Sequence, residues 1–274
     1  MVVQHNITAM NSNRMLGVTT ATQAKSTEKL SSGYKVNRAA DDAAGLAISE
    51  KMRRQIRGLT QASLNAQDGI SCVQTAEGAL AEVHDMLQRM NELVNKAGTD
   101  TLQQTDRSYI QSELDALVSE IDRVSATTTF NETMLLNGSF QNKRIQVGAE
   151  ASASNQINIS INKMSASGIG VKSINVVSAS GAQARSQLQS IKDALKSVSQ
   201  QRSDLGAVQN RLEHTVKNLD NVVENTTAAE SQIRDTDMAT EMVKFSNNNI
   251  LAQAGQSMLA QANQSNQGVL SLLG

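Results

Sequence analysis

The sequence predicts a mainly α-helical fold, in which long helices from the N- and C-terminal halves form a coiled-coil bundle with a small β-hairpin region in the middle. Three observations lead to this prediction: two long stripes of apolar residues at helical spacing, and a lack of proline. The 274 residues include no Pro and no Trp, and only three Phe and two Tyr. Proline removes a backbone donor and clashes with the preceding turn, so its absence favours long uninterrupted helices.

The first stripe lies in residues 41–97. Its apolar side chains fall mostly three and four residues apart, at Ile56, Leu59, Ile70, Val73, Leu80, Val83, Leu87, Met90 and Val94. At 1.5 Å per residue, a helix of this length would be roughly 80 Å long. Such a helix cannot bury its apolar side by folding on itself, so we expect it to pack against a second long helix.

The second stripe supplies that partner in residues 183–225. Eight of its ten positions are apolar, and steps of four and three alternate through Ile191, Leu195, Val198, Arg202, Leu205, Gln209, Leu212, Val216, Leu219 and Val223. This spacing is typical of a coiled coil. The simplest architecture therefore pairs a helix from each half of the chain.

A third helix is predicted between these two. Gly98 is a typical helix stop, and Ser108 with Gln111 forms the pattern of a capping box that opens the next helix. Its apolar positions are again four and three apart, at Ile110, Leu114, Leu117, Ile121 and Val124. A run of threonines at 127–129 ends it, and Asn137-Gly138 marks a turn.

The period changes from helix to strand within residues 140–178. Apolar residues alternate at Ile145 and Val147 and then at Ile157, Ile159 and Ile161, with a polar loop at 148–156 between them. This alternation indicates a β-hairpin. Glycines bracket a further group, which we expect to add a short irregular strand: Val171, Ile174 and Val176.

Both ends of the chain, residues 4–33 and 229–273, have helical spacing but are rich in Asn, Gln, Ser and Thr. Helices this polar are marginal alone, so we expect them to be disordered in the free subunit and to order on association. Gly33 ends the first helix, and connectors are predicted at 34–42 and at Thr226-Thr227. Asp41 and Asp42 are interpreted as a helix start rather than a metal or acid-base site, because carboxylates there cap free amides.

These elements predict three domains. Residues 1–42 with 226–274 hold the terminal helices and their connectors, and residues 43–140 with 183–225 form a helical rod. Residues 141–182 form the hairpin region. Inside the first long helix, four glycines each cost about 1 kcal/mol relative to Ala: Gly45, Gly58, Gly69 and Gly78. Either they admit close approach of a neighbouring helix or another copy, or they are simply tolerated.

Composition points away from catalysis and from nucleic acid. The chain has 25 basic and 26 acidic residues, so no electrostatic attraction to nucleic acid or an anionic membrane is expected. His5, His84 and His214 are isolated, the single Cys72 reads as a small semi-buried hydrophobe, and no phosphate-binding glycine loop or nucleophile motif occurs. We therefore expect no enzyme activity, metal or cofactor. Without a secretory signal pattern or an 18-residue apolar stretch, composition alone suggests a cytosolic protein.

Several motifs resemble the terminal blocks of bacterial flagellins. In the first half they are Glu-Lys-Leu-Ser-Ser-Gly at 28–33, Val-Asn-Arg-Ala at 36–39 and Asp-Asp-Ala-Ala-Gly-Leu-Ala-Ile-Ser at 41–49. In the second half they are Leu-Gly-Ala-Val-Gln-Asn-Arg-Leu at 205–212, Ala-Ala-Glu-Ser at 228–231, Ile-Arg-Asp at 233–235, and the ending from Ile250 to Leu273. The resemblance covers roughly residues 1–140 and 183–274, leaving little room for outer domains.

The resemblance implies an extracellular structural subunit that polymerises into the flagellar filament for swimming. It also implies export in an unfolded state by the flagellar type III pathway. The expected partners are other copies of the chain, a chaperone at the C-terminal segment, and the filament cap and hook-junction proteins. We expect apolar residues of the terminal segments to carry self-assembly: Ile7, Met10, Leu30, Phe245, Ile250, Leu251, Met258, Leu259, Leu270 and Leu273.

A receptor site is implied by the same resemblance. Flagellins that activate Toll-like receptor 5 contact it through an Arg and a Leu of the long helix and a Glu of the next helix. The matching positions here are Gln88, Arg89, Glu92, Leu93 and Glu113, whereas Met90-Asn91 replaces the aliphatic residue and Arg of many such flagellins. Arg89 and Glu113 could also form a simple interhelix ion pair, and one reading does not exclude the other.

Two other functions remain open from the sequence. A signalling coiled coil, such as the rod of a chemoreceptor, shares the Ala-, Ser- and Gln-rich composition, but it would lack strands and would usually carry a membrane segment. A junction protein between hook and filament has a similar arrangement of terminal helices. The match in both terminal blocks favours flagellin over either alternative.

Overall fold

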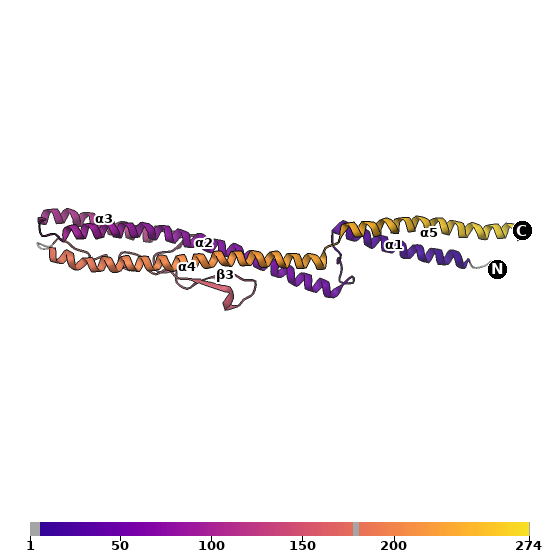
Figure 1. Cartoon of the computed structure of the whole chain (residues 1–274), viewed down its shortest axis with the longest axis horizontal. Coiled ribbons are helices and arrows are strands. Elements are labelled where there is room, and N and C mark those ends of the chain that lie inside the picture. The colour runs from indigo at the N-terminus through magenta and orange to yellow at the C-terminus, as the bar shows by residue number, and fades with distance from the viewer. Residues whose placement is uncertain (1–5, 178–180, 274) are drawn as a thin grey trace. The chain divides into compact units, whose positions relative to one another are not determined.

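The structure, a computed structural model, describes residues 6–177 and 181–273, and it describes the side chains of these residues except at 181 and 266–273. Long helices dominate it, which confirms the predicted mainly α-helical class (Figure 1). The helices are α1 (Ile7–Ser32), α2 (Ala43–Ala97), α3 (Gln104–Thr127), α4 (Gly181–Arg234) and α5 (Met238–Leu273). The strands are β1 (Thr129–Phe130), β2 (Thr133–Met134), β3 (Lys143–Gln146) and β4 (Gln156–Ile159), with a short 3₁₀ helix at Ala153–Asn155.

The chain divides into two compact units. The central unit is Gln55–Glu224, and the terminal unit contains the described residues up to Arg54 and from Asn225 onward. The division falls inside α2 and α4, which continue without a break from one unit into the other. Each unit is described separately below.

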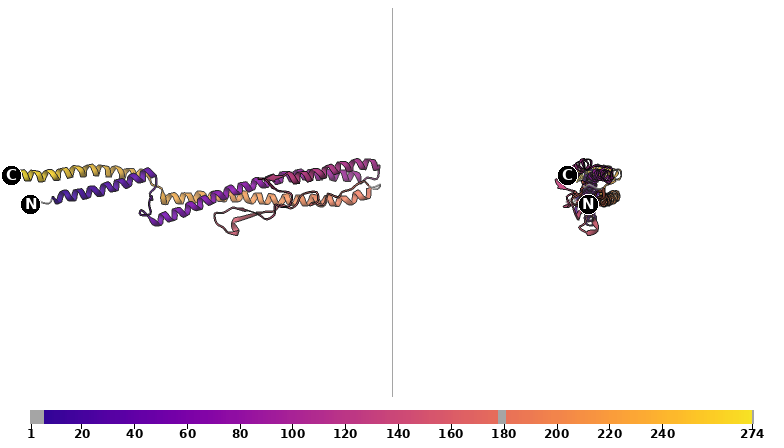
Figure 2. Two further views of the ribbon diagram at one scale, coloured as in Figure 1. Left: turned by 180° about the vertical axis from the view of Figure 1, so that it is seen from behind. Right: turned by 90° about the vertical axis from the view of Figure 1, so that its left-hand side faces the viewer.

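In the central unit, α2 and α4 run antiparallel beside each other, with α3 against the end of α2 (Figures 1 and 2). The two predicted stripes meet in the core, where Leu80, Leu87, Ile191 and Leu205 are at most 1% exposed. At the polar stripe position Arg202, the guanidinium reaches across to α2, and its Nη2 lies 2.7 Å from Glu77 Oε1. The coiled-coil pairing of the two halves is thus confirmed.

The predicted β-hairpin is also present. Strands β3 and β4 pair antiparallel, with Lys143 opposite Ile159 and Gln146 opposite Gln156. A second, smaller hairpin of β1 and β2 was not predicted, because strands of two residues show no readable period. Its turn residues Asn131 and Glu132 both have positive φ, which suits the tight turns that join antiparallel strands.

The prediction of a short strand around Val171, Ile174 and Val176 is wrong. Among the described residues this segment contains no strand, because helix side chains take the place of a partner strand. The Gln111 amide donates to Ile174 O at 3.0 Å and accepts from Val176 N at 2.9 Å. The Gln201 amide, only 3% exposed, bonds the backbone of residues 160 and 162 in the same way. Apolar side chains of the segment then fill the core between the helices.

Two predicted helix boundaries are wrong for local reasons. Helix α3 begins at Gln104 rather than near Ser108, because the Asp106 carboxylate accepts a hydrogen bond from the Gln103 N–H at 3.2 Å and caps the helix four residues earlier. Helix α4 passes through Thr226-Thr227 and ends at Arg234. Threonine costs a helix little, whereas Asp237 accepts from the amides of residues 239 and 240 and opens α5.

Some glycines of α2 admit close approach of another segment, and one is simply tolerated. A Cβ at Gly69 would collide with the Ile145 side chain, and one at Gly58 would lie 2.8 Å from the Ala149 Cβ, so these glycines admit the hairpin region. The close neighbour there is mainly the hairpin rather than another helix. At Gly78 a Cβ would meet nothing within 4 Å.

Candidate functional site

Helices α1 and α5 of the terminal unit form an antiparallel pair that meets along a narrow seam (Figure 1). The seam positions are all buried or half-buried, and they follow alternating steps of three and four on both helices. On α1 they are Ala9, Ser12, Leu16, Thr19, Gln23, Ser26 and Leu30; on α5 they are Glu241, Phe245, Asn248, Ala252, Gly255, Leu259 and Ala262. This is coiled-coil spacing, but ten of the fourteen residues are small or polar.

Polar groups in the seam fix its register. The Asn6 amide donates to Ala262 O at 2.9 Å at one end. Near the other end, Ser26 and Glu241 are only 3% and 7% exposed, and the Ser26 hydroxyl bonds the Glu241 carboxylate, which lowers the pKa of Glu241. Between them, Gly255 lets the Leu16 side chain come within 3.3 Å of the place where a Cβ would stand. The helices thus approach closely while burying little apolar area.

Large apolar side chains instead lie outside the seam. Among the described side chains, eleven large apolar ones of the terminal unit are at least 46% exposed, compared with two of the central unit. The eleven are Ile7, Met10, Met15, Val18, Ile48, Met238, Met242, Val243, Ile250, Leu251 and Met258. On α5 they occupy all the sides that the seam leaves free. Many large apolar side chains exposed on one unit mark a surface suited to contact with other protein.

The ten residues predicted to carry self-assembly fall into three groups. Ile7, Met10, Ile250, Leu251 and Met258 are exposed. Leu30, Phe245 and Leu259 lie half-buried in the seam. The side chains of Leu270 and Leu273 lie outside the part of the chain that the structure describes. The prediction did not include Met15, Val18 and Val243, three further apolar side chains that are exposed on α1 and α5.

The residues that follow α1 contact the residues at the end of α4, and this junction links the N-terminal and C-terminal parts of the terminal unit. Gly33 ends α1 with a φ of 76°, as predicted, and its carbonyl accepts from Thr236 N at 2.9 Å. Lys35 N donates to Arg234 O at 2.6 Å. The Arg234 guanidinium stacks 4.7 Å from the centroid of the Tyr34 ring and donates to Glu50 Oε1 at 2.7 Å. Backbone bonds and one arginine therefore connect α1, α2 and the end of α4.

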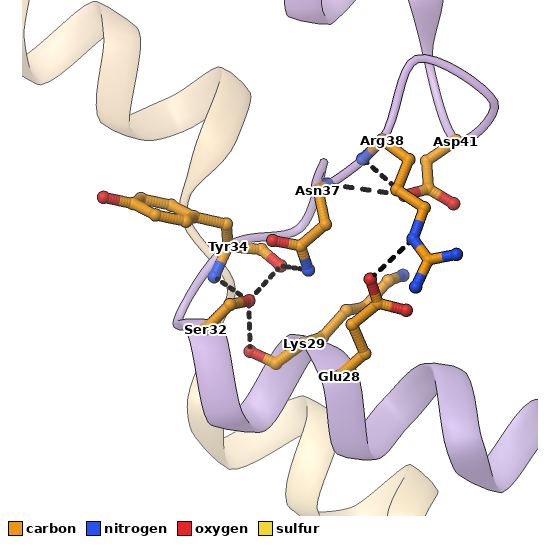
Figure 3. Close-up of polar contacts among 7 residues, drawn as sticks. All are labelled: Glu28, Lys29, Ser32, Tyr34, Asn37, Arg38 and Asp41. Carbon is orange, nitrogen blue, oxygen red and sulfur yellow. Dashed lines mark hydrogen bonds and ion pairs between the residues drawn. The ribbon is translucent and has the colours of Figure 1, made fainter.

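The connector after α1 is held by its own polar side chains (Figure 3). The Asp41 carboxylate accepts from the backbone N–H of Arg38 at 3.0 Å and of Asn37 at 3.4 Å. The Arg38 guanidinium reaches back to Glu28 of α1 at 2.9 Å. Asp42 accepts from Gly45 N at 2.9 Å and starts α2, so the helix-start interpretation is confirmed for Asp42, whereas Asp41 caps amides of the connector instead. The Tyr34 ring points away from this cluster, which leaves it free for Arg234 (Figure 3).

The predicted receptor residues lie in the central unit, where α2 faces α3. Arg89 Nη2 lies 2.8 Å from Glu113 Oε1, so the interhelix ion pair is present, and Arg89 Nη1 lies 3.2 Å from Glu92. The hydrogen bond to Glu113, with help from Glu92, raises the pKa of Arg89. Gln88 is exposed and lies 2.9 Å from a ring nitrogen of His84. Leu93 is only 4% exposed, so it forms the floor of this surface rather than a projecting contact.

The residues considered for chemistry are scattered. No group of three or more His, Cys, Asp or Glu that could hold a metal ion occurs among the described residues. His84 lies on α2 and His214 on α4, while His5 lies outside the described residues. Cys72 is 5% exposed in the core, and burial raises the pKa of its thiol. None of the described helices is both long and apolar enough to span a bilayer.

Comparison with known proteins decides the family. The bacterial flagellin N-terminal helical region matches residues 3–141, and the bacterial flagellin C-terminal helical region matches residues 188–273. The chain belongs to the flagellin family. It is 51% identical over 273 residues to the flagellin of Halalkalibacterium halodurans, with 100% of both chains covered. It is 48% identical to the flagellin of Bacillus subtilis and 49% identical to a flagellar filament 31.3 kDa core protein of Treponema maltophilum, again over 100% of each chain.

Only residues 142–187 lie between the two matched regions, so this flagellin is a short form without a large outer domain. Among solved structures, a putative flagellar hook-associated protein from Vibrio parahaemolyticus aligns with a TM-score of 0.58 over 71% of this chain and 100% of that chain. At 16% identity, this likeness concerns the fold alone.

Four carboxylates of the terminal unit have a lowered pKa because the folded unit stabilises their charged form. The causes are the Arg38 amide at Asp41, Arg234 at Glu50, Thr240 at Asp237 and Ser26 at Glu241. A group with a depressed folded pKa contributes stability above its unfolded pKa and loses it as the pH falls through the folded value. The terminal unit is therefore expected to lose stability below about pH 4.5.

A Tyr109→Phe background leaves Tyr34 as the sole tyrosine and makes its fluorescence a reporter of the terminal unit. We expect the urea midpoint of this signal to fall as the pH drops from 5 to about 3. Adding Glu241→Gln should lower the midpoint at pH 7 and flatten its pH dependence, since one of the four titrating groups is gone. An identical pH profile with and without Glu241 would contradict this assignment.

Proposed function

We propose that this flagellin is the structural subunit of a bacterial flagellar filament, extracellular and without enzyme activity, that serves swimming motility. The exposed apolar surface of the terminal unit supports this proposal most directly. Burying one large apolar side chain stabilises a complex by about 1.5–3 kcal/mol, so repeated contacts among identical copies could sustain a polymer. The near-zero net charge of the chain, −1, offers little repulsion between copies.

The thin seam has a second consequence for assembly. Because it buries few large apolar side chains, the pair of α1 and α5 gains little stability on its own. We propose that the pair is marginal in the free subunit and is completed by neighbouring copies. Helices that become stable only on assembly fit export of the chain in an unfolded state through the flagellar type III pathway. The lack of proline and of disulfides removes two slow steps from refolding outside the cell.

Other partners follow from the proposed route. A chaperone would hold the C-terminal segment before export, and α5 presents the exposed apolar side chains that a chaperone would cover. The filament cap would receive the subunit at the growing tip, and hook-junction proteins would begin the filament. No nucleic acid, membrane or cofactor is part of this proposal.

Electron microscopy after salt-induced or seeded polymerisation tests the function. The full chain should form long tubes, whereas a variant lacking residues 1–33 and 229–274 should form none, because it lacks the exposed apolar helices. Tubes from the truncated variant would refute the role of the terminal unit. If the full chain forms no tubes but binds tightly to hook ends, it acts as the junction protein instead.

We also propose that the exposed face around Arg89 contacts Toll-like receptor 5. The ion pair with Glu113 holds the guanidinium in place while leaving it 53% exposed. Met90, which departs from the pattern of many receptor-activating flagellins, is fully buried and cannot touch a receptor directly. The departure at Asn91 lies at a half-buried position beside the proposed contact.

Arg89→Ala should weaken binding to the purified receptor ectodomain by at least about tenfold, because it removes a charged hydrogen-bond donor. Filament formation should be unchanged. Arg123→Ala is the matched control, since Arg123 is another exposed arginine, paired with Glu120 on α3. Equal receptor affinity of the Arg89 variant and wild type would refute the proposed contact.

A further inference from the structure

Methionine supplies an unusual share of the exposed apolar surface of the terminal unit. Five of the eleven large apolar side chains exposed there are methionines, and each is 46–65% exposed: Met10, Met15, Met238, Met242 and Met258. In the central unit, Met90 and Met164 are at most 3% exposed, Met86 is half-buried, and Met134 is 44% exposed. The methionines that solvent reaches are thus concentrated on the helices proposed to contact other copies.

An exposed thioether has a chemistry that Leu, Ile and Val lack. Hydrogen peroxide transfers one oxygen to the sulfur: an S–O bond forms, the O–O bond breaks, and the remaining hydroxide takes a proton to leave as water. The sulfur loses two electrons and the peroxide gains them. The product, methionine sulfoxide, is polar and chiral, so it disrupts apolar interfaces, and methionine sulfoxide reductases reverse the change.

We propose that these five methionines form a redox-sensitive set, whose oxidation by peroxide raises the concentration that the free subunit needs to polymerise until the sulfoxides are reduced. The inference rests on the proposed function, because it assumes that the exposed helices bind other copies. Polymerisation should in turn protect the five sulfurs, since they become buried between subunits. The free subunit is then the sensitive form and the filament the resistant one.

The structure supplies two internal references. Met134 belongs to β2 of the central unit, so it should oxidise in the free subunit whether or not the five sites are altered. Cys72, the only cysteine, is buried with a raised thiol pKa, so it holds little of the thiolate that peroxide attacks. Sulfoxide formation at each methionine can be read by peptide mass spectrometry.

The test treats the full-length monomer with hydrogen peroxide, maps the sulfoxides, and measures the critical concentration for polymerisation. Oxidised protein should need at least about tenfold more protein to polymerise, because burying one methionine is worth that factor or more. Reduction by methionine sulfoxide reductases should restore the original value. The matched variant replaces all five residues by leucine (M10L, M15L, M238L, M242L, M258L), a change that conserves volume and apolar character. It should polymerise equally before and after peroxide, although Met134 is still oxidised.

The outcomes separate the inference from the proposed function. Undiminished polymerisation of wild type carrying sulfoxides at the five sites overturns the inference and leaves the proposed function intact. Failure of untreated wild type to polymerise overturns the proposed function and the inference together. If the leucine variant does not polymerise, preformed wild-type filaments are treated with peroxide instead, and the oxidation of the five methionines is compared with that of Met134. Protection of the five sulfurs relative to Met134 supports the inference, and equal oxidation of all six overturns it.

Discussion

The narrow seam between α1 and α5 determines which side chains of the terminal unit remain exposed, and the capacity for self-assembly depends on those side chains. Alanine, serine, glycine and short polar residues bring the two helices close together at the cost of apolar area. Asn6 and the buried pair of Ser26 and Glu241 set the register of that contact. Large apolar side chains such as Ile250 and Met258 are consequently left on the outer faces, where only further protein can bury them.

The central unit, in contrast, buries most of its large apolar side chains. Its long stripes of Leu, Ile, Val and Met are buried within a single chain by α2, α3, α4 and the hairpin region. The segment after β4 seals this core without forming a strand, since Gln111 and Gln201 satisfy its backbone groups from the helices. This unit therefore has a complete core of its own. The central unit has a filled core, whereas the pair of α1 and α5 leaves large apolar side chains exposed. This contrast suits the chain to forming a polymer.

Sequence reasoning succeeded where one physical signal dominated. Long runs at three-and-four spacing identified α2, α3 and α4, and strict alternation identified the β3–β4 hairpin. It failed where side chains override local pattern. The end of α4 depends on the cap that Asp237 provides for the next helix, and nothing local marks Gln201 as a backbone partner of residue 162.

The candidate site was predictable only in part for a related reason. The terminal segments show many apolar residues, but their sequence does not say which of them face the partner helix. Leu259 and Ile250 look alike in sequence, yet one lies in the seam and the other is 64% exposed. That distinction depends on the register between α1 and α5, which long-range contacts such as Asn6 to Ala262 decide.

This distinction also offers the most direct test. Ile250→Asn should leave the urea midpoint of the monomer, read by Tyr34 fluorescence in the Tyr109→Phe background, nearly unchanged, because an exposed substitution alters stability by only about 0.5 kcal/mol. It should raise the critical concentration for polymerisation at least about tenfold, since an apolar contact between copies is lost. Leu259→Asn, in the seam, should lower the monomer midpoint instead. An Ile250→Asn protein that polymerises like wild type, or that is destabilised as a monomer like the seam variant, would contradict the account.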